Sequence, residues 1–271
     1  MKCDVCFRHC DLAEGQVGFC RARGCKDGRI QALNYGLLTS LALDPIEKKP
    51  LKEFYPGSLI LSCGSYGCNL RCPFCQNFEI SQYNRKEECD YCPPEELVKL
   101  ALQSRKEGNI GLAFTYNEPM VGYEYVRDAA KLAKEHNLKT VLVSNGCASQ
   151  AALEAILPYI DAMNIDLKGF TPAYFAYVGG DFEMTKAFIS QAAQHCHVEL
   201  TTLVVPGHND ESKSMEEEAK WIASLNRKIP LHLTRYFPRY KEKEPATPEA
   251  TLKDLAAVAR RYLSSVYLGN I

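Results

Sequence analysis

Residues 58–77 read Ser-Leu-Ile-Leu-Ser-Cys-Gly-Ser-Tyr-Gly-Cys-Asn-Leu-Arg-Cys-Pro-Phe-Cys-Gln-Asn, and the interpretation of the whole chain starts from them. The first part, 58–63, is short, mostly apolar and followed by glycine, which is typical of a buried strand. The second part places Cys68, Cys72 and Cys75 at C-x3-C-x2-C spacing. The stretch therefore predicts three thiols on one loop that follows a buried strand directly.

Downstream of this first strand, helical patterns and β-like runs alternate, which makes six β/α units. Strands alternating with helices imply parallel pairing and right-handed crossovers. Eight such units close a barrel, so six predict an α/β fold: a partial, TIM-like (β/α)6 barrel, open along one side, with functional groups at the carboxyl ends of its strands. The expected strands are 58–63, 111–115, 139–144, 161–167, 198–205 and 231–234, with 265–268 as a further short strand. The expected helices are 93–106, 119–136, 148–157, 184–194, 214–225 with Ser214 as its cap, and 248–263 with Thr247 as N-cap and Pro248 at N1.

The composition excludes several classes of protein. The chain has 271 residues, 46% of them hydrophobic and 24% charged, which rules out wholesale disorder. The net charge is −1, so nothing indicates a nucleic-acid partner. No apolar run reaches the roughly 18 residues that a membrane span needs, and the start shows no secretory signal. We therefore expect a cytoplasmic protein without a membrane partner.

Thirteen cysteines are the most unusual feature of the composition. Without an export signal, clustered cysteines indicate metal binding or redox work more than a disulfide framework. Three thiolates on one short loop can hold three irons of a [4Fe–4S] cube, because cysteine is the usual cluster ligand. Cys63 is a poor fourth ligand because it lies within the expected strand. We therefore expect the fourth iron to be open to a small molecule; a structural zinc site or a plain electron-transfer cluster are the alternatives.

The loop, including Phe74 before its third cysteine, resembles the signature of radical S-adenosylmethionine (radical SAM) enzymes. That resemblance implies a radical SAM barrel in which the open iron binds S-adenosylmethionine and the reduced cluster cleaves it to a 5′-deoxyadenosyl radical. In detail, the chain resembles the radical SAM protein of the AmmeMemoRadiSam system, which is related to pyruvate formate-lyase (glycyl radical enzyme) activating enzymes. The segments that carry this resemblance are Cys3-x2-Cys6-x3-Cys10-x9-Cys20, Asp44 to Pro50, Phe54 to Gly57, Gly67 to Gln82, Thr115 to Pro119, Asp166 to Lys168 and Tyr267 to Asn270.

The same resemblance implies a set of cofactor-binding residues at the other strand ends. Asn117 and Glu118 stand where the family has a Gly-Gly-Glu-Pro-like segment that holds the methionine amino group, although its glycines are replaced here. Asp166 and Lys168 match an Asp-x-Lys that contacts the cofactor, and strand alternation places both on one face. The alternatives are a helix-start glutamate and a mutual salt bridge at the barrel rim. Ser144 and Asn145 match the family's Thr-Asn-Gly segment, and His232 matches a histidine near the sugar end of the cofactor.

The first fifty residues form a separate pattern, rich in cysteine and glycine. We expect an N-terminal module over residues 1–52 and the barrel over 53–271. Cys3, Cys6, Cys10 and Cys20 suit either a zinc ion or a second iron–sulfur cluster. We favour zinc, because a metal ion stabilises a segment that has little core of its own. Asp44 to Pro50 is expected to cover the barrel mouth.

Three functions remain open from the sequence. The first is an activating-enzyme-like oxidoreductase that abstracts hydrogen from a protein or peptide under anaerobic conditions. The second applies the same radical chemistry to a small metabolite, and the third is a non-enzymatic iron–sulfur electron-transfer protein. The resemblance also implies partners, namely an electron donor such as flavodoxin or ferredoxin and Memo-like or AMMECR-type proteins.

Overall fold

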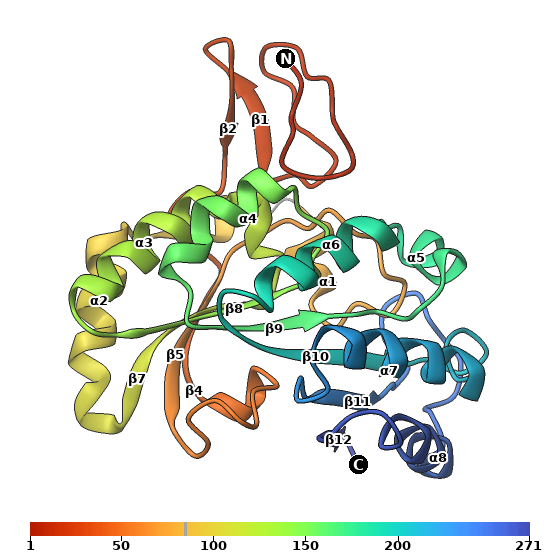
Figure 1. The fold of residues 1–271 in the computed structure, drawn as a ribbon. Helices are drawn as coiled ribbons and strands as arrows, with labels where there is room; N and C mark the ends of the chain where they lie inside the picture. Colours follow the sequence, from red (N-terminus) through yellow and green to blue (C-terminus); the bar gives the residue numbers. More distant parts are fainter. Residues whose placement is uncertain (84–85) are drawn as a thin grey trace.

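The computed structural model describes residues 1–83 and 86–271, and its centre is a sheet of eight strands in the order β12-β11-β10-β9-β8-β7-β5-β4. All neighbouring strands in it pair in parallel except β4, which pairs antiparallel with β5 at the edge (Figure 1). The strands of this sheet are β4 (Ser40–Pro45), β5 (Leu59–Gly64), β7 (Asn109–Phe114), β8 (Lys139–Ser144), β9 (Ala162–Asp166), β10 (His197–Val204), β11 (Leu231–Arg235) and β12 (Val266–Gly269). The partial barrel of alternating strands and helices is confirmed, and β12 is the further short strand.

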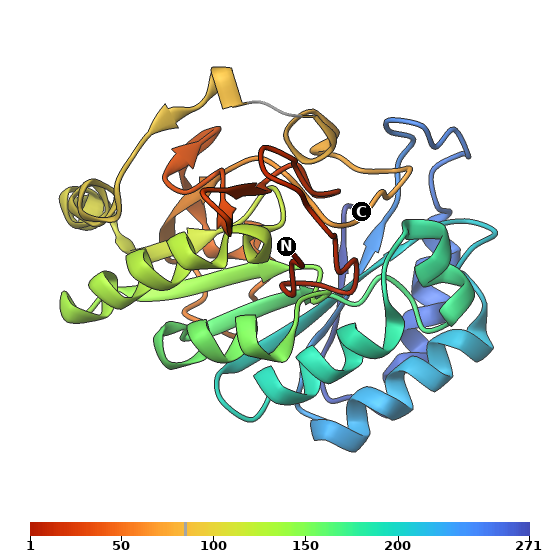
Figure 2. The same cartoon turned by 90° about the horizontal axis from the view of Figure 1, so that it is seen from above.

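Helices follow the parallel strands and cover the outer side of the sheet, as Figure 2 shows from above. The α-helices are α1 (Phe78–Gln82), α2 (Pro94–Gln103), α3 (Tyr123–Glu135), α4 (Gln150–Ile156), α5 (Pro172–Val178), α6 (Phe182–Ala192), α7 (Ser212–Asn226) and α8 (Glu249–Ala259). Short 3-10 turns are η1 (Ile46–Lys48), η2 (Lys86–Glu88), η3 (Ser104–Glu107), η4 (Pro119–Gly122) and η5 (Leu157–Tyr159). The remaining strands are β1 (Arg23–Lys26), β2 (Arg29–Ala32), β3 (Leu37–Leu38) and β6 (Asp90–Tyr91).

Two predicted helix caps are wrong. The helix α7 begins at Ser212, so Ser214 lies inside it rather than capping it. The helix α8 begins at Glu249, and the hydroxyl of Thr247 donates to the carbonyl of Val204 at 2.6 Å instead of capping the helix. A tertiary hydrogen bond to a buried strand has taken precedence over the local capping signal.

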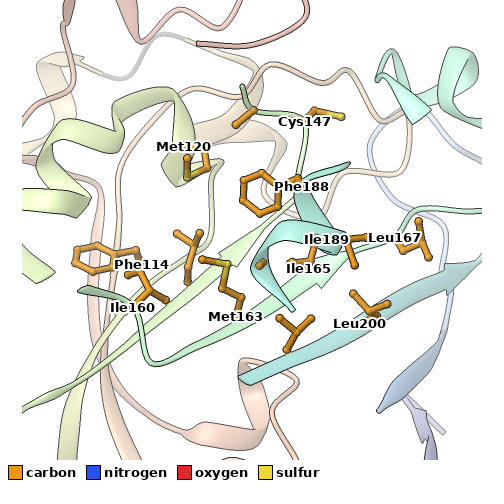
Figure 3. Close-up of a cluster of buried hydrophobic side chains, with 14 of the residues drawn as sticks. Phe114, Met120, Cys147, Ile160, Met163, Ile165, Leu167, Phe188, Ile189 and Leu200 are labelled. Carbon is orange, nitrogen blue, oxygen red and sulfur yellow. The ribbon is translucent and has the colours of Figure 1, made fainter. Parts of the chain in front are cut away.

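The main core lies between the outer face of the strands and the helices. Met163 and Ile165 on β9 point toward Phe188 and Ile189 on α6, and all four are at most 1% exposed (Figure 3). Each such side chain contributes about 1.5–3 kcal/mol by leaving water. The near-continuous apolar character of these strands reflects a parallel sheet with its outer face fully covered.

The inner face of the sheet is filled by the segment between β4 and β5. Ile46 and Leu51 of this segment are completely buried against Ala113, Val141 and Ala162. Asn164 also donates to the carbonyl of Pro50 from the inner face of β9, at 2.9 Å. The segment therefore packs within the barrel, which corrects the expectation that it covers the mouth.

The N-terminal residues form a module above the sheet, with the β1–β2 hairpin projecting from it (Figure 1). The strand β4, within residues 40–45, already belongs to the main sheet, so the chain enters the barrel earlier than residue 52. All thirteen cysteines are free thiols in the structure. In the described ranges, none of the helices combines the length and the apolar character needed for a membrane span.

Candidate cofactor site

The start of the three-cysteine loop is fixed by a close approach of the chain at Gly67 and by the side chain of Asn117. Gly67, which precedes Cys68, has a φ of 94°, and a Cβ there would lie 2.6 Å from the carbonyl oxygen of Cys20. Only glycine fits this left-handed conformation and this close approach. The side chain of Asn117 donates to the Gly67 carbonyl at 3.1 Å and accepts from the Ser65 amide at 3.0 Å. Asn117 thus holds the start of the loop.

The chemistry of the loop fits a cluster with one open iron. Cys72 is buried, Cys68 and Cys75 are half-buried, and the charges of the three thiols influence one another. Burial raises the pKa of Cys72 to about 12, so a bound metal would be needed to keep it ionised. Cys63 faces the helix layer and belongs to the main core.

Within residues 1–83 and 86–271, no three His, Cys, Asp or Glu side chains are arranged as ligands of a single metal ion. This arrangement is compatible with a cluster, because the cysteine ligands of an iron–sulfur cube each bind a different iron.

Glu118 joins the ends of two strands beneath the loop. Its carboxylate is 2% exposed and accepts hydrogen bonds from the Met120 amide at 3.0 Å, the Ser144 hydroxyl at 2.8 Å and the Asn145 amide at 2.7 Å. Burial raises the pKa of Glu118 to about 7, although these three donors oppose the rise. The carboxylate is thus engaged within the chain, and its contact with a cofactor ammonium stays a prediction.

Asn145 connects the end of β8 to the cysteine loop. Its side-chain amide donates to the side-chain oxygen Oδ1 of Asn69 at 2.9 Å and lies 3.7 Å from the Cys68 sulfur. Asn69 in turn donates to the carbonyl of Cys147 at 2.7 Å. Asn69 was not expected from the sequence, because Asn145 and Cys147 lie more than seventy residues away; its position between two loop cysteines is the signal that could have indicated it.

Asp166 and Lys168 form an ion pair at the end of β9. The Lys168 ammonium lies 2.6 Å from the Asp166 carboxylate, and it is close enough to Cys72 and Cys75 for their charges to affect it. Burial disfavours the ammonium, but Asp166 and the two thiols raise the pKa of Lys168 above its usual value. Asp166 and Lys168 thus lie on the same side of the chain, as the sequence predicted. They also form the mutual salt bridge that was considered as the alternative. Contact of the pair with a cofactor stays a prediction.

His232 contacts a second group of side chains on the inner face of the sheet, centred on Glu199. Its Nε2 lies 2.6 Å from Glu199, which is completely buried, and its ring stacks on Tyr267. Glu199 also contacts His197 at 2.9 Å and accepts from the amides of Lys52 and Glu53. Burial opposes the ionisation of Glu199, yet these donors lower its pKa to about 2. The sequence analysis missed Glu199, which holds the inner segment in place.

The fold and the arrangement at the strand ends define a barrel that presents three thiols, an ion pair and a buried carboxylate beside one another. A family model described as the radical SAM superfamily matches residues 63–219. This chain belongs to the radical SAM superfamily, a family of enzymes whose members bind a [4Fe–4S] cluster and S-adenosylmethionine. The residues described above fit that donor set.

Individual relatives agree with the family. An uncharacterized protein of Methanocaldococcus jannaschii is 37% identical, over 100% of this chain and 81% of its own length. A second protein of that organism, provisionally named a glycyl-radical enzyme activating enzyme, is 25% identical over 76% of this chain and 87% of its own length. A solved domain of a pyruvate-formate lyase-activating enzyme from Bacteroides vulgatus superposes with a TM-score of 0.52 at 18% identity, covering 59% of this chain and 99% of that domain.

Proposed function

We propose that this protein cleaves S-adenosylmethionine reductively and uses the resulting 5′-deoxyadenosyl radical to abstract hydrogen from a protein or peptide. The single observation that carries this proposal is the placement of the Asp166–Lys168 pair beside the thiols of the loop. Within the superfamily, we assign the chain to the AmmeMemoRadiSam group, on the segments quoted from its sequence. The similarity to a relative named for glycyl-radical enzyme activation supports the activating-enzyme-like part of the proposal.

The proposed roles of the residues follow from their placement. Cys68, Cys72 and Cys75 would hold the cluster, which supplies the electron that breaks the sulfonium bond of the cofactor. Lys168 and Asp166 present opposite charges on the inner face, where the carboxylate and ammonium of the methionine half could each find a partner.

Glu118, Asn117 and Asn145 act mainly as positioning residues in this proposal. Their described hydrogen bonds join the strand ends of β7 and β8 to the loop. The proposal also includes direct contacts with the cofactor. The residues proposed to make them are Asn117, Glu118, Ser144, Asn145 and His232.

A small metabolite as substrate is the second candidate, and one observation favours it. The segment with Ile46 and Leu51 occupies part of the barrel interior. Asn164 and Glu199 both bind its backbone, so the segment is anchored to the strands. An interior filled in this way leaves less room for an inserted loop of another protein.

Deuterium transfer separates the two substrates. We would incubate the reconstituted protein anaerobically with S-adenosylmethionine, dithionite and a uniformly deuterated protein partner, beginning with Memo-like and AMMECR-type proteins. Deuterium in the 5′-deoxyadenosine supports the protein substrate. Cleavage without deuterium from any of these partners, but with deuterium from a labelled metabolite extract, favours the small substrate. A flavodoxin or ferredoxin is the proposed physiological donor and would replace dithionite in a parallel reaction.

A further inference from the structure

The hydroxyl group of Tyr174 is buried without a hydrogen-bond partner. Tyr174 lies on α5 and is 3% exposed, and no group in residues 1–83 and 86–271 forms a hydrogen bond with its hydroxyl oxygen. A buried polar group without a partner costs free energy, so its presence needs an explanation. We propose that this hydroxyl donates a hydrogen bond to a sulfur of the iron–sulfur cluster beside Cys72 and raises the reduction potential of that cluster. This role rests on the cluster of the proposed function and is independent of the cleavage of S-adenosylmethionine.

The helix α5 is joined to the cluster loop at its carboxyl end. The amide of Arg71, the residue before Cys72, donates to the carbonyl of Val178 at 2.9 Å. Tyr174 precedes Val178 by about one helical turn. Burial raises the pKa of Tyr174 well above its usual range, and the charge of Cys72 is the next largest cause of the rise. The side chain of Tyr174 is therefore protonated and lies near the thiol of Cys72.

The local structure around Tyr174 fixes the position of its ring. The backbone amide of Tyr174 donates to the hydroxyl of Thr171, the N-cap of α5, at 3.1 Å. Gly169, directly after Lys168, leaves room for the ring, because a Cβ there would lie 2.7 Å from a ring carbon of Tyr174. The ring of Tyr177 packs on the same side chain, with the two ring centroids 5.7 Å apart. In a close-packed interior, a ring held in this way has little freedom to turn its hydroxyl toward another partner.

The chemistry of a tyrosine hydroxyl suits a sulfur acceptor. The hydroxyl is a hydrogen-bond donor at neutral pH, because its usual pKa is about 10. Hydrogen bonds to the sulfurs are one of the factors that set the reduction potential of an iron–sulfur cluster. Reduction adds a negative charge to the cluster, so a donor stabilises the reduced state more than the oxidised state. A hydrogen bond from Tyr174 therefore makes the cluster easier to reduce.

Tyr236 provides a matched control. It is 1% exposed, and its ring packs on Phe74 of the cluster loop with the ring centroids 6.4 Å apart. Its hydroxyl, unlike that of Tyr174, has an acceptor within the chain, the carbonyl of Glu244 at 3.2 Å. Tyr236→Phe should therefore lower the melting temperature of the metal-free protein, whereas Tyr174→Phe should not, because it removes a hydroxyl without an internal partner.

Potentiometric titration of the full chain tests the proposal. Wild type, Tyr174→Phe and Tyr236→Phe would be reconstituted anaerobically with iron and sulfide, and the electron paramagnetic resonance of the reduced cluster would be followed without S-adenosylmethionine. Tyr174→Phe should shift the equilibrium toward the oxidised cluster by up to about tenfold, which for one electron is about 59 mV to more negative potential. Tyr236→Phe should leave the potential unchanged, because its hydroxyl is bonded within the chain.

Three results would overturn this assignment. One is a Tyr174→Phe protein whose cluster has the potential of the wild type. Another is an equal shift in both variants, which would assign the effect to packing at the loop rather than to the hydroxyl. The third is a metal-free Tyr174→Phe protein that is less stable than the wild type, because the hydroxyl would then have a partner within the chain. A wild type that binds the cluster but does not cleave S-adenosylmethionine would contradict the proposed function and leave the predicted shift in potential intact.

Discussion

The ammonium group of Lys168 lies 2.6 Å from the carboxylate of Asp166, at the carboxyl end of β9 and next to the cysteine loop. A second lysine–aspartate pair, Lys134 with Asp161, has the same separation and lies just before the amino end of β9. The two pairs have similar chemistry at opposite ends of one strand. A comparison of variants in the two pairs therefore distinguishes a role at the cofactor site from a general contribution of ion pairs to the stability of the fold.

Lys168→Met should weaken the binding of S-adenosylmethionine by at least about tenfold, or about 1.4 kcal/mol. The reason is that the variant leaves Asp166 without its ion-pair partner and removes a cation whose charge acts on Cys72 and Cys75. Isothermal titration of the anaerobically reconstituted protein measures the dissociation constant. Lys134→Met is the control and should leave it unchanged. Equal weakening by both variants would argue against a cofactor role for Lys168.

Glu118→Gln should destabilise the strand ends without removing a cluster ligand. The glutamine NH2 would face one of the three groups that now donate to the carboxylate, which costs about 1–3 kcal/mol. Thermal denaturation of the metal-free protein measures the loss. Glu124→Gln, which changes a half-buried carboxylate bound to Arg23, provides the comparison for a generic loss of charge. A variant as stable as the wild type would contradict the proposed positioning role of Glu118.

Glu199 should make the protein sensitive to acid. Its pKa in the folded chain is lowered to about 2, so its stabilising effect is present above its usual pKa and is lost as the pH falls toward 2. A shift of this size corresponds to about 3 kcal/mol at neutral pH. Urea unfolding of the wild type and of Glu199→Gln between pH 7 and 3 measures the difference, with roughly unit steps in pH sufficient to resolve it.

The difference in unfolding free energy between these two proteins should shrink as the pH is lowered. Glu183→Gln is the control, because that side chain is 77% exposed. A constant difference across the whole range would show that the ionised form of Glu199 does not hold the inner segment.

Glu218→Gln should have the opposite effect on pH dependence. Glu218 is 1% exposed on α7, and burial raises its pKa to about 8. A carboxyl group whose pKa rises on folding loses stability as the pH increases through the interval between its unfolded and folded pKa values. The Glu218 carboxyl lies 2.5 Å from the Thr202 hydroxyl, which donates to the Leu167 carbonyl. The variant should therefore be more stable than the wild type at pH 9 and similar at pH 5, measured by urea unfolding.

The parts of the fold that the sequence predicts are those determined by local pattern. An apolar run such as 139–144 is recognised as a buried strand from its local pattern alone. The strand β8 has the bounds that this pattern predicts. The same alternation places Asp166 and Lys168 together. The segment with Ile46 and Leu51 was not placed correctly, because Ala113, Val141 and Ala162, against which it packs, lie 60 or more residues away in the sequence. Asn69 and Glu199 were missed for the same reason. Asn145, which binds Asn69, and Lys52, which binds Glu199, lie on distant segments, so no local sequence pattern predicts these contacts.

The production of 5′-deoxyadenosine tests the central claim most directly. The full chain, reconstituted anaerobically with iron and sulfide, would be incubated with dithionite and S-adenosylmethionine, and the products would be quantified by mass spectrometry. We predict 5′-deoxyadenosine and methionine in equal amounts from the wild type, and only background from Cys68→Ala. A wild type that carries about four irons per chain but yields no more 5′-deoxyadenosine than Cys68→Ala would contradict the account.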